Sequence, residues 1–481
     1  MISKRDEQSR KNIQMVDIDS LVPEKHLVRL VDKVIDFEFI REIVKEYYSE
    51  DKGRPSIDPV VLFKIVFIQF LFGIRSMRQT IKEIEVNNAY RWFLGYGFTE
   101  PIPHFSTFGK NYIRRFKDTD VFEQIFKHIL EMLIKNGFIK EETYFIDSTH
   151  IKAYANKRNV HNEYIEEDYN KYITNYHNEL NEERIKEGKK PLDFKSTKKV
   201  AVSNVDPDSG MFHKGEKEKQ LAYSVQTAVD ENGYVIDCKT TAGSENDNPA
   251  GMEFLNELTE NHPNTKEMVM DAGYTSPVLL DLLIKKGVIP VIPYSRPKGK
   301  KADNEEFMFR KMDYKFIPSE NHYVCPYMKI LKYKGIGSQG YLEYKTTTKD
   351  CRDCPFKHRC TNQSTKSIKR HLFEYTKDIT REFRLSDVGK ELYQKRKFTV
   401  ERTFAQCKIS HCLGFTLVRG LKKNHDRNLI IYSIANLKKL ALFVMKNQLE
   451  IPKLSTFLRS VLLKFRLFFL KYQKNSLVIS N

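Results

Sequence analysis

The chain has 481 residues, which is too long for one ordinary domain and favours two or three. Its hydrophobic content of 40% and aromatic content of 12% exclude a mainly disordered protein and allow a sizeable core. The formal net charge of +18 favours a polyanionic partner, most commonly nucleic acid. A Lys-rich protein without such a partner is the alternative.

The apolar stretches of the sequence do not resemble a signal peptide or a membrane span. The N-terminal residues contain no apolar stretch of the kind found in a signal peptide. The longest apolar run, residues 60–73, is interrupted by Lys64 and Gln69 and is shorter than the ~20 residues that a membrane span needs. We therefore expect this run to be a buried helix, and the protein to be soluble and cytoplasmic.

Residues 1–138 are predicted to be a helical domain, because apolar residues recur there at helical spacing. Asp58 followed by Pro59 indicates a helix start, and Ser106 is a candidate cap of a later helix. Short helices with arginines among them suit a DNA-binding module. A plain helical bundle with a basic surface explains the pattern equally well.

Strands and helices alternate over residues 139–293. A short apolar run ending at Asp147 predicts a strand, and two more strands are predicted on either side of a turn at 231–233. A helix then precedes a strand that ends at Asp271, and another helix and strand complete this part. Residues 155–218 are highly charged, so we expect a solvated helical excursion or a mobile insertion there.

Residues 294–390 break this alternation with short strand-like runs and predict an inserted domain. Helical spacing returns over residues 391–450, where the first helix carries Glu401. This order of elements is that of the RNase H-like fold, an α/β fold in which helices flank a mixed sheet. Residues 451–481 form a basic, apolar tail that suits a packed or partner-binding helix, and no function is assigned to it.

Three acids, Asp147, Asp271 and Glu401, stand where that fold brings side chains together. Carboxylates at the ends of adjacent strands and on a following helix can share metal ions, and their hard oxygen atoms suit Mg²⁺ or Mn²⁺. Two such ions can activate a water on one side of a phosphate and stabilise the leaving oxygen on the other. A single acid at a strand end is more often a turn or cap residue, so the order of all three carries the prediction. Asp247 is a rival acid, for which a helix-capping role is at least as well supported.

The residues around these acids resemble those of the DDE transposases of bacterial insertion sequences. The first acid lies in YFIDSTHIKAYAN, the second in MVMDAGYTSP and the third in FTVERTFAQCKISHCLGFTLVRGL. The similarity includes GSENDNPA and the helical stretch DPVVLFKIVFIQFLFGIRS, and it extends over roughly residues 20–445. Each motif alone is weak, and their combination is specific.

The resemblance implies a DNA transposase with an RNase H-like catalytic core. In such an enzyme the three acids would hold two Mg²⁺ or Mn²⁺ ions, and the phosphodiester at the element ends would be hydrolysed. The freed 3′-OH would then be joined to target DNA. The implied partners are double-stranded DNA, as terminal inverted repeats and target, and a second copy of the chain in a synaptic complex. DNA contacts are implied for Tyr393, Arg396, Arg402 and Lys408.

One spacing departs from the family pattern Tyr-x2-Arg-x3-Glu-x6-Lys. Tyr393-x2-Arg396 and Glu401-x6-Lys408 are both present, but four residues separate Arg396 from Glu401. Either Lys397 takes the place of the arginine, or the helix starts at a different residue. Glu401 and Lys408 are seven residues apart and share a helix face, so Lys408 can reach a phosphate near the acids. A solvated lysine is the alternative.

Four of the seven cysteines lie between the last predicted strand and the helix of Glu401. A Cys-x2-Cys pair with two further thiols suits tetrahedral Zn²⁺, and an intracellular protein disfavours disulfides. We therefore predict a small zinc-ribbon-like insertion with structural Zn²⁺. Reduced, partly buried cysteines are the main alternative, and a [4Fe–4S] cluster is another. The predicted ligands are Cys325, Cys351, Cys354 and Cys360.

Two other functions are compatible with the sequence. One is a protein of the same fold that binds DNA but is catalytically inactive, or acts only as a nuclease. The other is a zinc-containing DNA-binding regulator in which the acids are structural. Cleavage of DNA at the element ends separates the first reading from both.

Overall fold

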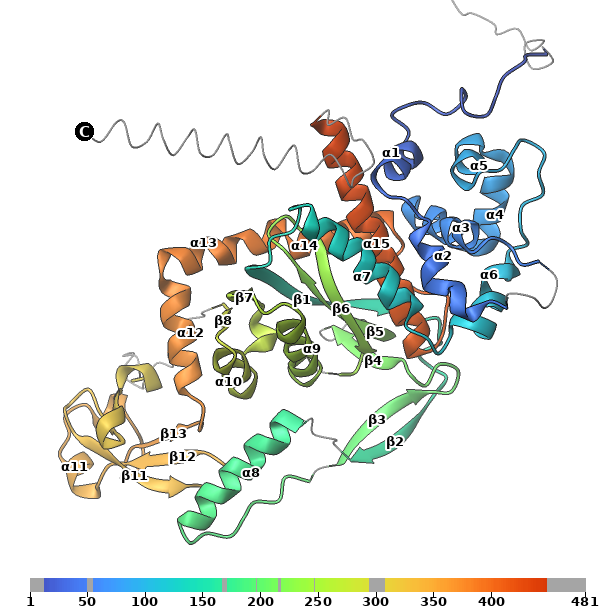
Figure 1. Ribbon diagram of the computed structural model, residues 1–481. Helices are drawn as coiled ribbons and strands as arrows, with labels where there is room; N and C mark the ends of the chain where they lie inside the picture. The colour runs from blue at the N-terminus through green and yellow to red at the C-terminus, as the bar shows by residue number, and fades with distance from the viewer. Residues whose placement is uncertain are drawn as a thin grey trace, which may run out of the picture.

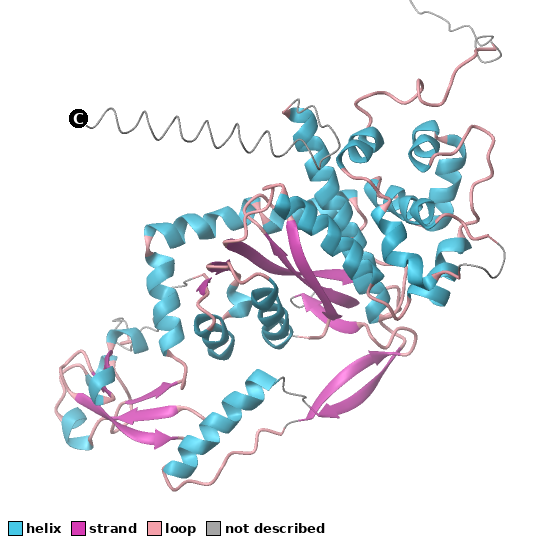
Figure 2. Ribbon diagram, in the orientation of Figure 1, coloured by secondary structure: helices cyan, strands magenta, loops and turns pink. Residues whose placement is uncertain are grey.

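The computed structural model describes residues 13–49, 55–166, 171–195, 197–214, 218–245, 247–293 and 308–447. Over these residues the protein is a mixed α/β structure with a helical N-terminal region and sheets of six, five and two strands (Figures 1 and 2). The helical N-terminal region and the mixed α/β character confirm the coarse prediction. The tail at 451–481 lies outside the described residues.

The N-terminal region contains seven α-helices within its described residues. Helix α3 begins at Pro59 because the Asp58 carboxylate accepts a hydrogen bond from the Val60 N–H at 2.8 Å, and proline suits the first helical position. Almost all of α3 is buried, as the apolar run predicted. The seven helices are α1 (Leu27–Val34), α2 (Phe39–Val44), α3 (Pro59–Leu71), α4 (Met77–Val86), α5 (Asn88–Leu94), α6 (Ser106–Asn111) and α7 (Val121–Lys135).

Ser106 does not cap α6, which corrects the prediction. It is the first residue of that helix, and Phe105 at the cap position makes no side-chain cap bond. The Ser106 hydroxyl instead lies 2.9 Å from Nδ1 of His104. The helix forms as expected, but the Ser106 hydroxyl does not accept a capping hydrogen bond from the N–H groups of its first turn.

The six-stranded sheet carries the residues of greatest interest. Strand β5 pairs antiparallel with β1 on one side and with β6 and β4 on the other, and β1, β7 and β8 run parallel. The order across the sheet is therefore β6–β5–β1–β7–β8, with β4 beyond the end of β6. The strands are β1 (Thr143–Lys152), β4 (Gly210–Lys214), β5 (Glu218–Val229), β6 (Val235–Ala242), β7 (Glu267–Val269) and β8 (Ile289–Val291).

The apolar run predicted that strand β1 ends at Asp147, and this prediction is wrong. The strand continues to Lys152, because pairing with β5 continues as far as Lys152 opposite Ala222. The predicted turn between β5 and β6 is confirmed, with Gly233 in the left-handed region at φ 74°.

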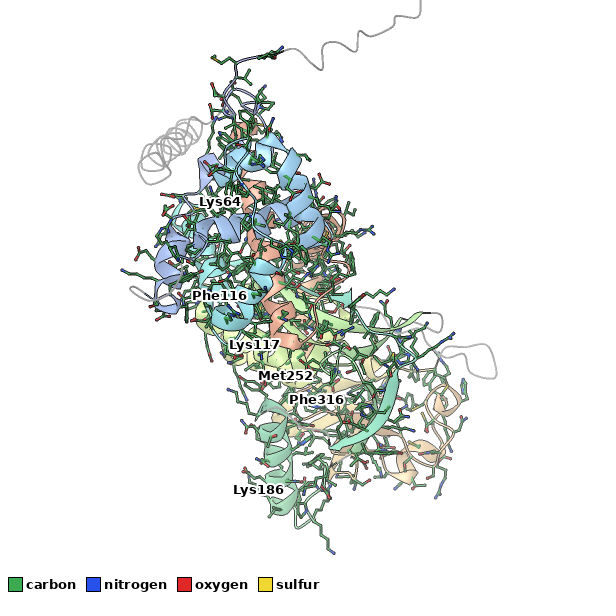
Figure 3. The ribbon with its side chains drawn as sticks, turned by 90° about the vertical axis from the view of Figure 1, so that its right-hand side faces the viewer. Lys64, Phe116, Lys117, Lys186, Met252 and Phe316 are labelled. Atoms are coloured by element: carbon green, nitrogen blue, oxygen red, sulfur yellow. The ribbon has the colours of Figure 1, made fainter. Side chains whose placement is uncertain are left out.

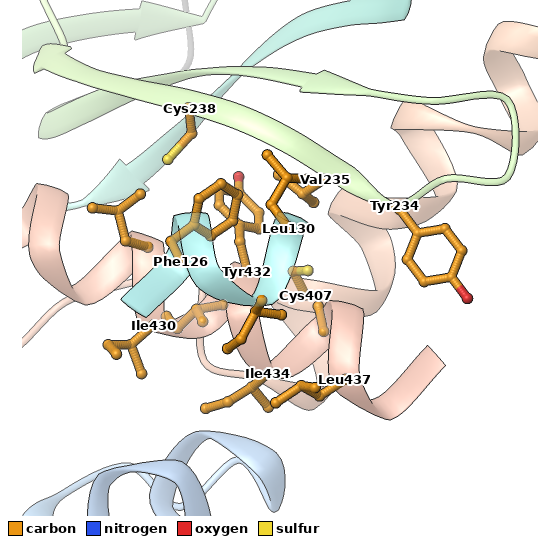
Figure 4. Packing of buried hydrophobic residues seen from close by; sticks show 14 of the residues in the cluster. Phe126, Leu130, Tyr234, Val235, Cys238, Cys407, Ile430, Tyr432, Ile434 and Leu437 are labelled. Atoms are coloured by element: carbon orange, nitrogen blue, oxygen red, sulfur yellow. The ribbon is translucent and has the colours of Figure 1, made fainter. Parts of the chain in front are cut away.

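Helix α15 (Leu421–Lys446) joins the N-terminal region to the sheet through one hydrophobic core. Asn436 on α15 accepts from the Val235 N–H and donates to the Val235 carbonyl, both at 2.8 Å. Figure 4 shows Phe126 of α7, Cys238 of β6 and Tyr432 of α15 in this core. Among the described residues α15 is the one helix long and apolar enough to cross a membrane, and 72% of that apolar window is buried inside the protein.

Two helices lie beside the sheet: α9 (Asp247–Asn261), which contacts β5 and β6, and α10 (Pro277–Lys285), which contacts β8. Helix α14 (Val400–Ser410) follows much later in the chain and contacts β1 and β5. The N-terminal region, with Lys64 and Phe116, occupies one end of the molecule in Figure 3, and Lys186 lies near the other.

The charged stretch 155–218 is more ordered than its composition predicted. It forms a two-stranded antiparallel ribbon of β2 (Val160–Glu166) and β3 (Thr197–Ser203) and the helix α8 (Lys171–Lys186). One face of α8 is packed: Leu180 is only 1% exposed, and Arg184 donates to the carbonyls of Ile336 and Gly337 at 2.8 and 2.9 Å. This first insertion is therefore docked on the second one.

The second insertion forms the five-stranded antiparallel sheet, in the order β13–β12–β11–β10–β9. It has a separate core of Tyr314, Tyr323, Leu331, Tyr344 and Ile368. Its elements are β9 (Lys315–Ile317), β10 (His322–Val324), β11 (Ile330–Ile336), β12 (Leu342–Lys345), α11 (Thr348–Arg352) and β13 (Ser367–Arg370).

Helical structure returns at α12 (Tyr375–Leu385), well before the expected boundary at 390. Helix α13 (Asp387–Lys395) follows. In Figure 1 these two helices lead from the small sheet back to α14 beside β1. The inserted sheet therefore occupies less of the chain than predicted.

Candidate acidic site

Asp147 lies within β1, and Asp271 lies two residues after the end of the neighbouring strand β7. Strands β1 and β7 are parallel, with Phe145 opposite Val269. Asp147 and Asp271 each stand two residues beyond that pair, so both lie toward the same end of these two strands. The Asp147 side chain is 17% exposed.

The segment after Asp271 is held against the sheet by a buried tyrosine. The Asp271 carboxylate accepts from the Gly273 N–H at 2.7 Å and caps a short 3-10 turn, Ala272–Tyr274. Tyr274 is fully buried, and its hydroxyl donates to the side-chain carbonyl of Gln226 on β5. Its ring lies against Gly251 of α9, where an added Cβ would come within 2.9 Å of it. This packing explains why a tyrosine follows the second acid.

The helix carrying Glu401 starts with a break that explains the unusual spacing. Helix α13 ends at Lys395, a 3-10 turn covers Arg396–Phe398, and Thr399 has φ −105° and ψ −95°. Helix α14 then begins at Val400. The break accommodates the extra residue between Arg396 and Glu401. This supports a different helix start and not a replacement of the arginine by Lys397. Arg396, and not the exposed Lys397, is the cation that contacts Glu401.

Arg396 joins the first and third acids. Its Nη2 lies 2.6 Å from Oδ2 of Asp147, and its Nη1 lies 3.1 Å from Oε1 of Glu401. The arginine side chain is 12% exposed, whereas that of Glu401 is 47% exposed. The planar guanidinium presents its donors to two carboxylates at once. Sequence reasoning assigned Arg396 to DNA and missed this contact; the departure in spacing was the available signal.

Tyr393 lies in the electrostatic field of the same cluster. Burial raises the pKa of its hydroxyl, and the positive charge of Arg396 lowers it. The negative charges of Asp271 and Glu401 raise this pKa further. Asp271 therefore belongs to the same neighbourhood as Glu401 and Arg396. Together these contacts bring all three predicted acids, Tyr393 and Arg396 into one region.

The other predicted site residues are placed differently. Lys408 and Arg402 are both exposed on α14. Burial lowers the pKa of Lys439 on α15, and the charge of Arg402 lowers it further. Lys408 shares its helix face with Glu401. Asp247, the rival acid, is the first residue of α9, and its side chain lies outside the described set.

The four predicted zinc ligands all lie in the second insertion, and all are free thiols. The Cys360 sulfur lies 2.9 Å from the Tyr314 hydroxyl, and the Cys351 sulfur lies 3.0 Å from that of Thr346. Burial raises the pKa of Cys360, and the charges of Cys351 and Cys325 raise it further. Cys325 and Cys360 both pack against the core of this insertion, and Cys354 is half-buried.

Across the described ranges, no group of three or more His, Cys, Asp or Glu side chains is arranged to hold a metal ion. At the acidic site the physical reason is visible, because the guanidinium of Arg396 fills the space between Asp147 and Glu401.

Two protein families match the chain. Residues 16–114 match the family described as "Transposase domain (DUF772)", and residues 324–441 match "Transposase DDE domain". Both matched families are transposase families, and together they support a DDE transposase. DDE transposase domains generally use divalent metal ions. No curated protein matches the chain.

Among solved structures the chain is similar to "Mos1 transposase paired-end complex with left transposon end" and "Crystal structure of a pre-cleavage Mos1 transpososome". Each is 11% identical, with a TM-score of 0.16, and the alignment covers 50% of this chain. The chain spans 61% of the length of the solved transposase that it matches. A likeness at this score carries no argument about site or mechanism.

Proposed function

We propose that this chain is an enzyme of DNA transposition: it hydrolyses the phosphodiester at the element ends and transfers the freed 3′-OH to target DNA. The contact that carries the proposal is the ion-paired cluster of Asp147, Arg396 and Glu401 beside Asp271. The order of the core strands, with β1, β5 and β6 antiparallel and β1, β7 and β8 parallel, supports an RNase H-like catalytic core.

The donor set of the cluster suits Mg²⁺ or Mn²⁺. Asp147, Asp271 and Glu401 offer carboxylate oxygens, which are the ligands that these ions prefer. Bound metal ions supply an activated water and stabilise the charge on the leaving oxygen. The three carboxylates would hold two such ions at the edge of the sheet. Because Glu401 is half-exposed, a phosphate can approach from its side of the site.

Cationic residues near the acids would bind the DNA. Arg396 and Lys408 are in reach of a phosphate that lies over the acids, and the Tyr393 hydroxyl can donate to the same backbone. Arg402 would contact DNA further along α14. The net charge of +18 supports double-stranded DNA as partner, and joining two element ends favours a homodimer. We place the enzyme in the cytoplasm, on the nucleoid.

We further propose that the described insertions divide the chain into domains. The helical region to residue 138 would bind DNA, and the catalytic core would combine 139–293 with 391–450. The second insertion, within 294–390, would bind structural Zn²⁺ through its four cysteines. The packing of Cys325 and Cys360 against one core supports this. Tyr314, which contacts Cys360, and Thr346, which contacts Cys351, would then become second-layer hydrogen-bond donors to the thiolates.

The test is cleavage of linear DNA that carries the terminal inverted repeats of the element, with Mg²⁺ or Mn²⁺. We expect 3′-OH ends, followed by joining to a second DNA. Nicking without joining would reduce the proposal to a nuclease. Specific binding without any cleavage, in a protein with normal folding, would leave only a DNA-binding protein and contradict the proposal.

A further inference from the structure

The acidic site contains its own cation. The Arg396 guanidinium uses one nitrogen on Asp147 and another on Glu401, at 2.6 and 3.1 Å. We propose that Arg396 is an internal counter-ion that competes with divalent metal for these two carboxylates and is withdrawn when DNA phosphate arrives. This inference rests on the proposed function, since it concerns how metal enters that same site.

Electrostatics explains why the site needs a cation in the free protein. Three carboxylates at one edge of the sheet repel one another, and the Asp147 side chain is mostly buried, where such repulsion is poorly screened. A guanidinium between two of them offsets that repulsion through charge-assisted hydrogen bonds. A metal ion shared by Asp147 and Glu401 must occupy the same space. Arginine and metal are therefore alternatives.

The local backbone allows Arg396 to leave. The residue stands where α13 ends, in the 3-10 turn before the break at Thr399, so it is not fixed inside a continuous helix. Its Nε is buried and has no hydrogen-bond partner, so two ion pairs hold the guanidinium in the site. Two oxygens of a phosphate can accept the same paired N–H bonds as a carboxylate.

This arrangement makes metal binding and DNA binding mutually reinforcing. A phosphate that takes Arg396 frees Asp147 and Glu401 for metal, and metal at those acids frees Arg396 for phosphate. Coupling of this kind is reciprocal by thermodynamic necessity. The consequence is a site that binds metal weakly until DNA is present, which would limit hydrolysis by the free protein.

The experiment measures Mn²⁺ affinity of the full chain by the electron paramagnetic resonance signal of free Mn²⁺, without DNA. The Mn²⁺ binding that Asp147→Asn removes is assigned to the acidic site. We expect Arg396→Ala to bind Mn²⁺ about 10-fold more tightly than the natural chain. Lys397→Ala is the matched control, because it removes an equal charge from the same turn at an exposed position. It should leave the affinity near that of the natural chain.

Addition of an end-DNA duplex should tighten Mn²⁺ binding in the natural chain and have a much smaller effect in Arg396→Ala. Arg396→Gln, which preserves most of the side-chain volume, repeats the test if the alanine variant is poorly folded. Unchanged or weaker Mn²⁺ binding in both variants, at a site that Asp147→Asn removes, overturns the counter-ion alone. If no variant shows Mn²⁺ binding that Asp147→Asn removes, the proposed metal site and the counter-ion are both overturned.

Discussion

The core sheet and the small sheet each gather polar residues that the sequence marked as metal ligands, yet they do so differently. At the core sheet, carboxylates from β1 and α14 share one cation, and Glu401 is open to solvent. At the small sheet, thiols lie beside tyrosine and threonine hydroxyls and pack against an aromatic core. Opposed charges at an accessible site suit a reacting centre, whereas partly buried thiols suit a structural one.

The largest expected effect is a loss of DNA cleavage when the acids at the core sheet are replaced. Asp147→Asn, Asp271→Asn and Glu401→Gln should each reduce DNA cleavage at least about 1000-fold, because each removes a metal-binding charge. Each variant should remain folded, because each substitution preserves the shape of the side chain, although Asp147→Asn and Glu401→Gln each remove an ion pair with Arg396. Glu391→Gln, an exposed acid on α13, is the control and should keep full activity. Unfolding of the three acid variants, in place of inactivation, would break the comparison.

The next effect concerns the thiols. Replacing Cys325, Cys351, Cys354 and Cys360 together with serine should abolish bound zinc and destabilise the small sheet by several kcal/mol. Elemental analysis of the purified protein and limited proteolysis of the second insertion measure the two outcomes. Cys412→Ser, outside that sheet, should change neither. Full zinc content in the quadruple variant contradicts the structural site.

A smaller effect is expected where the insertions meet. Arg184→Ala removes charge-assisted hydrogen bonds to the carbonyls of Ile336 and Gly337, so α8 should detach at a local cost of roughly 2–4 kcal/mol. Hydrogen exchange should speed up in α8 and β11 and stay unchanged in β1. Lys186→Ala, at an exposed position of α8, should leave exchange as it was. Equal exchange in both variants would show that the contact does not hold α8 in place.

The smallest effect is a pH dependence at the boundary between core and N-terminal region. Burial lowers the pKa of His411 to about 4, and its Nδ1 lies 2.8 Å from the Phe70 carbonyl of α3. In the unfolded chain His411 binds a proton below about pH 6.5, whereas in the folded protein it stays neutral until about pH 4. The contribution of neutral His411 to the free energy of unfolding is therefore complete above about pH 6.5. It should fall by up to about 3 kcal/mol as the pH drops to 4. Denaturant unfolding at several pH values tests this.

His411→Asn is the comparison for that series, because its side-chain amide can donate to the same carbonyl without titrating. The variant should be less stable at pH 7, and its stability should depend less on pH between 6.5 and 4. The same pH dependence in both proteins would assign the loss to other groups, such as His371 or His425, whose pKa values burial also lowers to about 4.

Local pattern predicted much of the fold because it is encoded locally. Helical spacing located α3 and α15, and apolar runs before the aspartates located β1 and β7. What failed depended on distant partners. The extent of β1 is set by its pairing with β5, and the docking of α8 depends on contacts with distant residues, such as those of Arg184 with Ile336 and of Tyr176 with His371.

The site itself divides in the same way. The apolar runs that precede Asp147 and Asp271 predicted two strands, and the structure pairs these strands in parallel, so both aspartates lie toward the same end of them. The contact of Arg396 with both Asp147 and Glu401 could not be predicted, because it depends on the backbone break at Thr399. A one-residue departure in spacing was its only trace in the sequence.

The most direct measurement of the central claim replaces the metal with Fe²⁺ in the presence of end DNA and maps where hydroxyl radicals cut the chain. If Asp147, Asp271 and Glu401 hold the same ions, cuts should appear near all three positions. Mg²⁺ should suppress them together, and Asp147→Asn should abolish them. Cuts at one of these positions alone, or cuts that Mg²⁺ does not suppress, would contradict a shared site.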